Sequence, residues 1–275
     1  MISEKDLKNF ATQIRIETVK CIKKRGFGHV GGCMSIADVL SVLYSDVMKI
    51  DPTHPDWEDR DYLVLSKGHA GPALFATLAL KGYFPLDWLN TMSEPGTKLP
   101  SHADRLRTPG VDVTTGSLGQ GLSIAVGLAK GFKIRKKNNR AFVILGDGEC
   151  AEGQNWEAAM AASHYKLGNL VTFVDWNKRQ VDGYVEDIMD PGNIEQKFKA
   201  FGWYATTVDG KDPIAIRDVV YKTLKEQGDQ PAAIILDGIK GAGVEEFERM
   251  FDNHFFDLDE KLSDQVIEEL EAKLD

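Results

Sequence analysis

The feature that most restricts the fold is a pair of apolar runs joined by a helical pattern, between residues 141 and 174. Residues 141–145 form a continuous apolar run and residues 170–174 a nearly continuous one, as is typical of strands buried on both faces of a sheet. Residues 152–165 between them have helical spacing. A strand, a helix and a second strand at this spacing indicate a βαβ unit with parallel strands and a right-handed crossover. This segment therefore predicts an α/β protein.

The rest of the chain continues the alternation of strands and helices. Ser3 with Asp6, and Ser35 with Asp38, resemble capping boxes that open the first two helices. The other expected elements are a loop at 28–32, strands at 62–65 and 232–236, and helices after Pro72, after the glycine-rich segment 116–121, after Asp212 and at 262–274. This alternation predicts an α/β fold with a doubly wound, mainly parallel sheet and helices on both faces.

Composition excludes several classes of protein. The chain has 275 residues and a net charge of −9, which argues against a protein that binds nucleic acid or an anionic membrane over its whole surface. Its three cysteines, Cys21, Cys33 and Cys150, form no CxxC motif, which favours a reducing cytoplasm. The N-terminus has no apolar signal core, and no run of the sequence approaches the length of a membrane span.

Both strands of the βαβ unit are followed by a side chain that carries oxygen. Asp147 lies between Gly146 and Gly148 directly after the first strand, and Asn177 follows the second. Ligands of such sheets bind beyond the carboxyl ends of the strands, and hard oxygens there suit Mg²⁺, with phosphate oxygens completing the shell. An aspartate between glycines is also an ordinary turn residue, but an asparagine thirty residues further on makes the pattern more specific.

Three histidines lie in loops among glycine or other small residues. His29 stands in GHVGG, His69 in SKGHA and His102 in SHAD. A single loop histidine is usually a surface residue, whereas three in such surroundings predict a polar pocket.

Taken together with the segment 114–121 (TTGSLGQG) and the GDG turn, these histidines resemble the motifs of transketolase, a family of thiamine diphosphate enzymes. The resemblance runs from about residue 8 to residue 240 and is most specific at 66–69, at 115–121 and at Asp147 with Asn177. It implies the thiamine diphosphate-binding fold, with thiamine diphosphate and Mg²⁺, or another divalent cation such as Ca²⁺, as cofactors.

The resemblance also implies roles for individual residues. The cation would be held by Asp147, Asn177 and the backbone carbonyl of Arg179. Cofactor-binding positions are His69, Gly116, Ser117, Leu118, Gly148, Glu149 and Asn177. Catalytic positions are His29, His69, His102, His254 and Glu152, of which Glu152 matches an acid that links paired active sites across a dimer.

Two positions depart from the family pattern. Ser101 and Ala103 flank His102 where the family usually has glycine and proline, and Phe255 follows His254 where glycine or histidine is common. The departures leave the diphosphate site intact and bear on the choice of donor and acceptor. His254 belongs either to the pocket or to a solvated loop.

Transketolases are larger chains, and this one matches only their N-terminal domain. The resemblance therefore implies a single thiamine diphosphate-binding domain over residues 1–275 with a C-terminal helical extension, as the N-terminal subunit of a split transketolase. The pyrimidine-binding domain, with the glutamate that activates the cofactor, is expected on a partner chain, in a dimer of heterodimers. The implied reaction moves a two-carbon ketol unit from a ketose or ketose phosphate to an aldose. Nucleic acid and membranes are not expected partners.

Three alternatives stay open at this point. The alpha chain of a 2-oxo acid decarboxylase or dehydrogenase shares the GDG turn and the later asparagine, although the SKGHA segment and the loop histidines favour transketolase. A 1-deoxyxylulose-phosphate synthase normally carries its pyrimidine domain in the same chain. A cofactor-binding scaffold without activity has no reason to keep the whole set of site residues.

Overall fold

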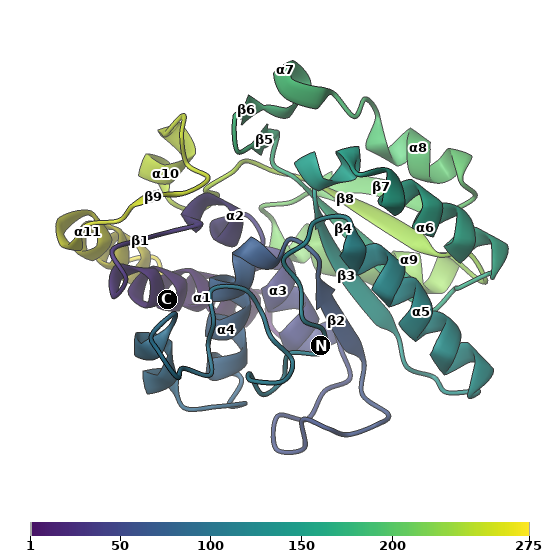
Figure 1. The fold of residues 1–275 in the computed structure, drawn as a ribbon, viewed down its shortest axis with the longest axis horizontal. Helices are drawn as coiled ribbons and strands as arrows, with labels where there is room; N and C mark the ends of the chain where they lie inside the picture. The colour runs from purple at the N-terminus through teal and green to yellow at the C-terminus, as the bar shows by residue number, and fades with distance from the viewer. Residues whose placement is uncertain (1, 275) are drawn as a thin grey trace.

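The computed structural model of the protein describes residues 2–274, and a parallel sheet of five strands runs through its centre (Figure 1). The strands lie in the order β2-β3-β4-β8-β7, and every neighbouring pair is parallel. They are β2 (Tyr62–Leu65), β3 (Ala141–Gly146), β4 (Leu170–Trp176), β7 (Tyr204–Asp209) and β8 (Ala232–Asp237). The predicted parallel α/β sheet is confirmed.

Helices cover both faces of this sheet, as the doubly wound prediction requires (Figure 1). One face carries α1 (Glu4–Lys23), α3 (Ala37–Val42), α4 (Gly71–Leu80) and α9 (Pro213–Glu226). The other carries α5 (Gln120–Ile134), α6 (Gly153–His164) and α8 (Ile194–Ala200). Along β3, Phe142 and Ile144 join the first core, whereas Val143 and Leu145 join the second, because successive side chains of a strand point to opposite faces.

Shorter elements surround the sheet. The remaining helices are α2 (Val30–Met34), α7 (Val185–Met189), α10 (Glu245–Arg249) and α11 (Glu260–Glu271). Single 3-10 or π turns occupy Leu43–Val47, Gly68–Ala70, Leu86–Thr91 and Gly148–Ala151. Two antiparallel ribbons pair β1 (Phe27–Gly28) with β9 (Phe256–Asp257) and β5 (Arg179–Gln180) with β6 (Gly183–Tyr184).

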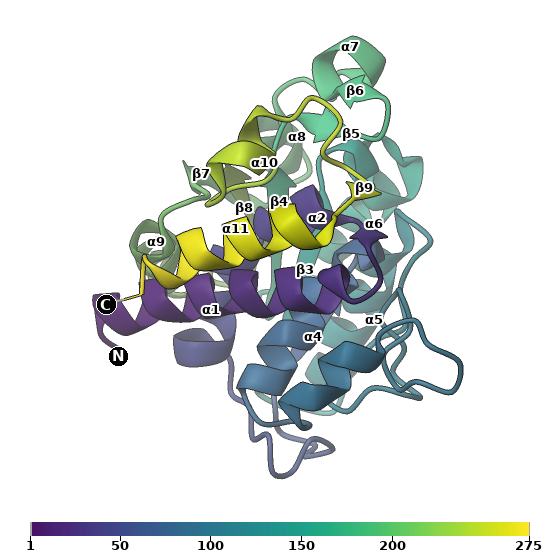
Figure 2. The same cartoon turned by 90° about the vertical axis from the view of Figure 1, so that its left-hand side faces the viewer.

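The C-terminal helix α11 lies alongside α1 (Figure 2). The Lys23 Nζ atom lies 2.6 Å from Asp264 Oδ1 across this contact. Residues Val266 and Leu270 of α11 are buried in the first core. The predicted C-terminal helix thus exists, two residues earlier at its start than expected, and it closes the fold against the first helix.

The second predicted capping box is wrong. Ser35 is not the cap of a helix: its Oγ donates to Asp175 Oδ2 at 2.7 Å, and α3 begins at Ala37 without a side-chain cap. Asp38 instead forms a buried ion pair with Arg15 of α1. The segment expected as a loop at 28–32 contains the start of α2. Tertiary partners thus decide the local structure here. Ser3 is confirmed as the N-cap of the first helix, because its Oγ accepts from Asp6 N at 3.1 Å. The Asp6 carboxylate accepts from Ser3 Oγ at 2.6 Å.

One strand of the central sheet was not predicted from the sequence, and neither were the short strands of the two ribbons. β7 lies at the edge of the sheet beside β8, and only Ala205 of its six residues is buried. Residues such as Thr206 and Thr207 give this strand no continuous apolar run. Edge strands lack the two-sided burial that makes central strands recognisable.

Residues 30–47 are apolar and long enough to cross a membrane by those two criteria alone, but 83% of them are buried inside the protein. They are also divided between α2, α3 and the turn that follows. A core position accounts for their apolar character.

Candidate active site

A pocket of about 350 Å³ lies at the carboxyl edge of the sheet, where β3 and β4 end side by side. Its wall includes several residues that the sequence predicted, among them His69, Leu118, Gly148, Glu152 and His254. Asp147 and Asn177 also line this pocket, from the ends of the two neighbouring strands. The βαβ unit therefore brings the two oxygen-bearing residues into one site, as expected.

The three groups expected to hold a cation are fixed by hydrogen bonds. The two carboxylate oxygens of Asp147 accept from Gly148 N at 2.7 Å and Lys178 N at 2.6 Å. Asn177 Oδ1 accepts from Arg179 N at 3.2 Å. The carbonyl of Arg179 accepts from Lys240 Nζ at 3.0 Å. Each of these oxygens keeps a second lone pair, so the donor set suits a hard cation such as Mg²⁺.

These groups do not complete a cation site alone. Within residues 2–274, no group of three or more histidine, cysteine, aspartate or glutamate side chains is arranged to hold a metal ion. Magnesium in proteins commonly keeps one or two carboxylates and takes its other ligands from water and phosphate oxygens. The residues present fit a cation that arrives together with a diphosphate.

A buried network behind Asn177 was not predicted from the sequence. Lys67 is 1% exposed, and its Nζ donates to Asp175 Oδ2 at 2.6 Å and to the Gly32 carbonyl at 2.7 Å. Asp175 Oδ2 also accepts from Asn177 Nδ2 at 2.7 Å. This contact fixes the asparagine with its amide nitrogen toward Asp175. Lys67 lies in the SKGHA motif, but nothing in the spacing of that motif indicates that the lysine is buried.

Two buried ammonium groups lie in the wall of the pocket. Lys67 and Lys240 both line it and both are buried. Burial, and then the charge of Lys67, lower the pKa of Lys240 to about 8. Burial, and then the charge of Asp175, raise the pKa of Asp147 to about 7. A bound anion would favour the charged form of the two lysines, and a bound cation would favour the charged form of Asp147. The pocket therefore suits an anionic ligand that carries a metal ion.

Four predicted histidines lie together. The ring centre of His29 lies 5.3 Å from that of His69, 6.1 Å from that of His102 and 5.2 Å from that of His254. His254 Nδ1 also lies 2.8 Å from Lys240 Nζ. Of the two expectations for His254, the structure therefore supports the pocket.

Burial keeps these histidines neutral. It lowers the pKa of His29 to about 4, with further contributions from His102, Lys240 and Arg25. Burial, and then the charge of Lys240, lower the pKa of His254 to about 3. The pKa values of His69 and His102 are lowered too, mainly by burial. At neutral pH each ring therefore has one nitrogen that donates and one that accepts a hydrogen bond.

The lowered pKa of His29 predicts acid sensitivity. Between its ordinary value of 6.5 and about 4, the unfolded chain binds a proton that the folded chain does not. The free energy of unfolding should therefore fall as the pH falls through this window. Urea denaturation of His29→Asn at pH 7 and pH 5 should show a smaller pH dependence than the wild-type chain. An equal dependence in His29→Asn and wild type would contradict this assignment.

The glycine-rich segment packs closely against the histidines. A Cβ atom on Gly68 would lie 2.8 Å from Gly116 N, so the two backbones can approach only because residue 68 is glycine. Gly116 has φ +150° and lies beside the His102 ring. Ser117 and Leu118 follow and are exposed.

The two glutamates differ in their surroundings. Glu149 is buried, and its carboxylate accepts from Ser66 Oγ, from Gly119 N at 2.8 Å and from Gly146 N at 3.0 Å. Because internal donors occupy both oxygens, Glu149 positions the loops of the site. Glu152 is exposed at the start of α6, with its stem beside Gly119.

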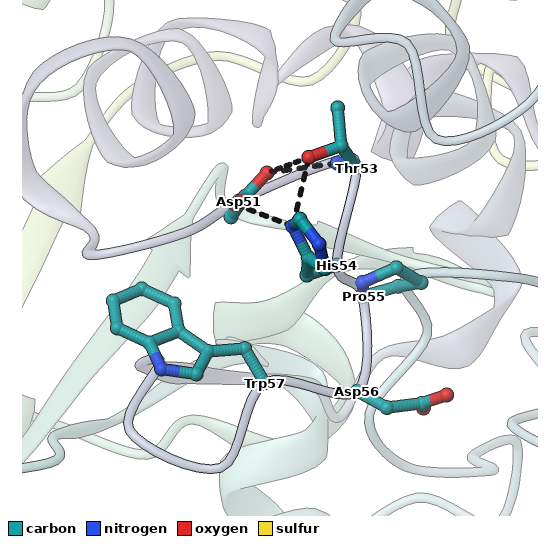
Figure 3. Close-up of a pocket in the computed structure, with 6 residues that line it drawn as sticks. All are labelled: Asp51, Thr53, His54, Pro55, Asp56 and Trp57. Atoms are coloured by element: carbon teal, nitrogen blue, oxygen red, sulfur yellow. Dashed lines mark hydrogen bonds and ion pairs between the residues drawn. The ribbon is translucent and has the colours of Figure 1, made fainter.

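A second, wider hollow lies in the loop that precedes β2, at the opposite edge of the sheet (Figure 3). The carboxylate of Asp51 there accepts from Thr53 N at 2.9 Å and lies 2.9 Å from His54 Nδ1. The polar groups of this loop thus bond to one another, and they do not converge on the hollow as those of the first pocket do.

The fold and the first pocket define a class of protein. A parallel α/β sheet with hard oxygens, buried ammonium groups and neutral imidazoles beyond its carboxyl edge has the arrangement typical of proteins that bind a phosphorylated ligand at this end of the strands.

The comparisons with known proteins give the family. The family model described as "Transketolase, thiamine diphosphate binding domain" matches residues 7–272, and the chain belongs to this family. It is 48% identical over 268 residues to the 6-deoxy-6-sulfo-D-fructose transketolase subunit of Clostridium sp. (strain MSTE9), covering 98% of this chain and 97% of that one. It is 37% identical to an apulose-4-phosphate transketolase subunit of Phocaeicola vulgatus, covering 84% of this chain and 81% of the relative.

Longer transketolases match over part of their length. Transketolase 2 of Escherichia coli is 35% identical, and the match covers 88% of this chain but 37% of that protein. The crystal structure of transketolase from Campylobacter jejuni aligns with a TM-score of 0.90 at 29% identity, over 98% of this chain and 43% of that one. The predicted membership of the transketolase family and the predicted fold are confirmed.

Proposed function

We propose that this chain is the N-terminal, thiamine diphosphate-binding subunit of a split transketolase. The observation that carries the proposal is the convergence of Asp147, Asn177, Lys67 and four neutral histidines on one edge of the sheet. The coverage pattern supports it, because the chain matches nearly the whole of the relative from Clostridium and less than half of the longer transketolases.

Asp147, Asn177 and the Arg179 carbonyl would hold Mg²⁺, or another divalent cation such as Ca²⁺, on the diphosphate. Lys240 would balance the remaining negative charge, and Gly148 would bring its backbone close to the ligand. When bound, thiamine diphosphate supplies the electron sink that carbon–carbon cleavage next to a ketone requires. The chain's own part is to position this group and the sugar.

The histidines would move protons at the sugar. In ketol transfer the bond between C2 and C3 of the donor breaks, the C3 hydroxyl becomes an aldehyde, and C2 then bonds to the aldehyde carbon of the acceptor. A neutral imidazole can accept the proton of the C3 hydroxyl and return a proton to the acceptor's new hydroxyl. His29 and His102 would take this role at the mouth of the pocket, whereas His69 would face the cofactor.

A partner chain would complete the site. Exposed apolar side chains lie in the wall of the pocket, where Val181 is 63% exposed and Met189 60%. Phe251, 67% exposed, lies near Arg179 of the same wall. Apolar patches next to a pocket are typical of interfaces. We infer a partner that carries the pyrimidine-binding domain and the activating glutamate, in a dimer of heterodimers whose paired sites are linked through Glu152.

The substrates would be a ketose donor and an aldose acceptor, each carrying a phosphate or a sulfonate. The first relative is named for a sulfonated fructose and the second for a sugar phosphate. The net charge of −9 and the three buried free cysteines favour the cytoplasm as the compartment, without nucleic acid or membrane as a partner.

Reconstitution tests the proposal. The purified chain alone should transfer no ketol units. Addition of its pyrimidine-domain partner, thiamine diphosphate and Mg²⁺ should give transfer from a ketose to an aldose. Chromatography of the sugar products measures the transfer. Transfer by the chain alone would contradict the proposal that the enzyme is split between two chains. If the two reconstituted chains bind the cofactor but accept only 2-oxo acids as donors, the protein belongs to a decarboxylase. If they do not bind the cofactor, the chain is a scaffold.

A further inference from the structure

One buried carboxylate oxygen accepts three hydrogen bonds next to the pocket. Asp175 Oδ2, near the end of β4, accepts from Lys67 Nζ at 2.6 Å and from Asn177 Nδ2 at 2.7 Å. Ser35 Oγ donates to the same oxygen at 2.7 Å. The side chains of Lys67 and Asp175 are each 1% exposed, so water does not compete for these contacts. Asn177, which lines the pocket, is therefore held by an ion pair that the solvent does not reach.

The two partners of the Asn177 amide admit one orientation of this group. A side-chain amide has an oxygen that accepts and a nitrogen that donates, and a half-turn of the group exchanges them. The carboxylate of Asp175 takes the nitrogen, whereas the backbone N–H of Arg179 takes the oxygen at 3.2 Å. The contact with Asp175 thus leaves Oδ1, and not Nδ2, with a free lone pair for a ligand in the pocket.

Lys67 supplies the counter-charge for Asp175. A buried carboxylate is costly unless a group of opposite charge is paired with it. Lys67 lies in the turn after β2, and β3 lies between β2 and β4 in the sheet. The lysine stem passes the end of β3 beside Gly146, where an added Cβ would lie 3.9 Å from Lys67 Cβ and 4.0 Å from its Cδ. The ammonium is fixed at the far end, because it also donates to the Gly32 carbonyl at 2.7 Å.

We propose that Lys67 and Asp175 are positioning residues for the cation site: Lys67 balances the charge of Asp175, and Asp175 holds Asn177 with its oxygen toward the cation. This inference rests on the proposed function for the identity of the ligand, a divalent cation bound to a diphosphate. Mg²⁺ requires nearly octahedral geometry, so an asparagine oxygen held in one place suits it. An ion pair that served only to tie α2 and β2 to β4 would act on the fold and not through Asn177.

A charge-neutral replacement of the ion pair tests the proposal. Lys67→Met with Asp175→Leu removes the acceptor for Asn177, leaves the net charge unchanged and puts apolar groups in the place of buried charges, which often costs little stability. In the two reconstituted chains, the affinity for thiamine diphosphate in the presence of Mg²⁺ should fall about 10- to 100-fold in calorimetric titration. In an Asn177→Ala background the same replacement should cause a further loss of about twofold or less, because the group that it positions is gone. Wild-type affinity, or an equal loss in both backgrounds, would overturn the proposal.

Two other double variants are controls. Arg60 Nη2 lies 2.6 Å from Asp112 Oδ1 in a second buried ion pair, near the start of β2 and away from the pocket at its carboxyl end. Arg60→Met with Asp112→Leu should therefore leave the affinity for the cofactor unchanged. Lys67→Met with Asp175→Asn keeps an oxygen that can accept from Asn177 Nδ2, and it should recover most of the lost affinity.

Urea denaturation shows whether each variant folds. If the Asp175→Leu variant does not fold, Lys67→Met with Asp175→Ser takes its place, because the shorter serine gives Ser35 a partner but does not reach Asn177, and the same losses are expected. Cofactor binding needs no turnover, so two chains that bind in this way but transfer no ketol unit would contradict the proposed function and not this inference. Wild-type chains that bind no thiamine diphosphate would overturn both.

Discussion

Replacing Asp147 by alanine should remove most of the Mg²⁺-dependent affinity for thiamine diphosphate. The substitution takes away a charged oxygen ligand and also the acceptor that fixes Lys178 N at 2.6 Å. Changes behind a metal's direct ligands typically cost about 10- to 100-fold in affinity, so the loss of a direct ligand should reach at least the upper end of that range. Calorimetric titration of the reconstituted pair with thiamine diphosphate in the presence of Mg²⁺ measures the effect.

Asn177→Ala provides a second variant whose cofactor affinity can be compared with that of Asp147→Ala. It removes a neutral ligand, so affinity should fall less than in Asp147→Ala. Neither variant should change the free energy of unfolding much without cofactor, because both side chains lie in the wall of the pocket and not in the two apolar cores. Unchanged cofactor affinity in Asp147→Ala would exclude this residue as a ligand.

Removing either mouth histidine should lower turnover. His29→Ala and His102→Ala should each cost about 3 kcal/mol, or about a hundredfold in kcat, because a positioned polar group that acts on the developing charge is lost. The dissociation constant for thiamine diphosphate should stay unchanged in both variants, and kcat and kcat/KM should fall together. Steady-state kinetics with the best ketose donor gives these values.

Two further histidine variants separate the roles. His69→Ala should mainly raise the apparent dissociation constant for thiamine diphosphate, because this residue lies in the turn after β2 and lines the pocket. His54→Ala, at the opposite edge of the sheet, should match the wild type (Figure 3). Wild-type turnover in both His29→Ala and His102→Ala would mean that the mechanism is misassigned.

Central elements could be predicted from the sequence because their signals are local. Continuous apolar runs mark β3 and β4, and the glycines around Asp147 mark the turn between β3 and α6. Motif resemblance then predicted that the histidines share one pocket. In the structure the ring of His254 lies close to those of His29 and His69, and His69 and His254 line the pocket. The roles of these residues stay predictions.

The missed features depend on contacts between distant segments. Ser35 looks like a helix cap in sequence, but its hydroxyl partner is 140 residues away, at Asp175. Burial of Lys67 follows from the meeting of α2, β2 and β4, and no pattern near residue 67 encodes it.

The pocket is assembled from residues between positions 32 and 254, so almost the entire chain must be folded before the pocket exists. A ligand that binds there binds the native state alone, and its concentration therefore contributes to the folding equilibrium. At a hundred times its dissociation constant such a ligand adds about 2.7 kcal/mol. When the cell is short of this vitamin-derived ligand, the stabilisation is lost and a larger fraction of the chains would be unfolded and open to proteolysis. The amount of the protein in the cell would therefore follow the supply of its ligand.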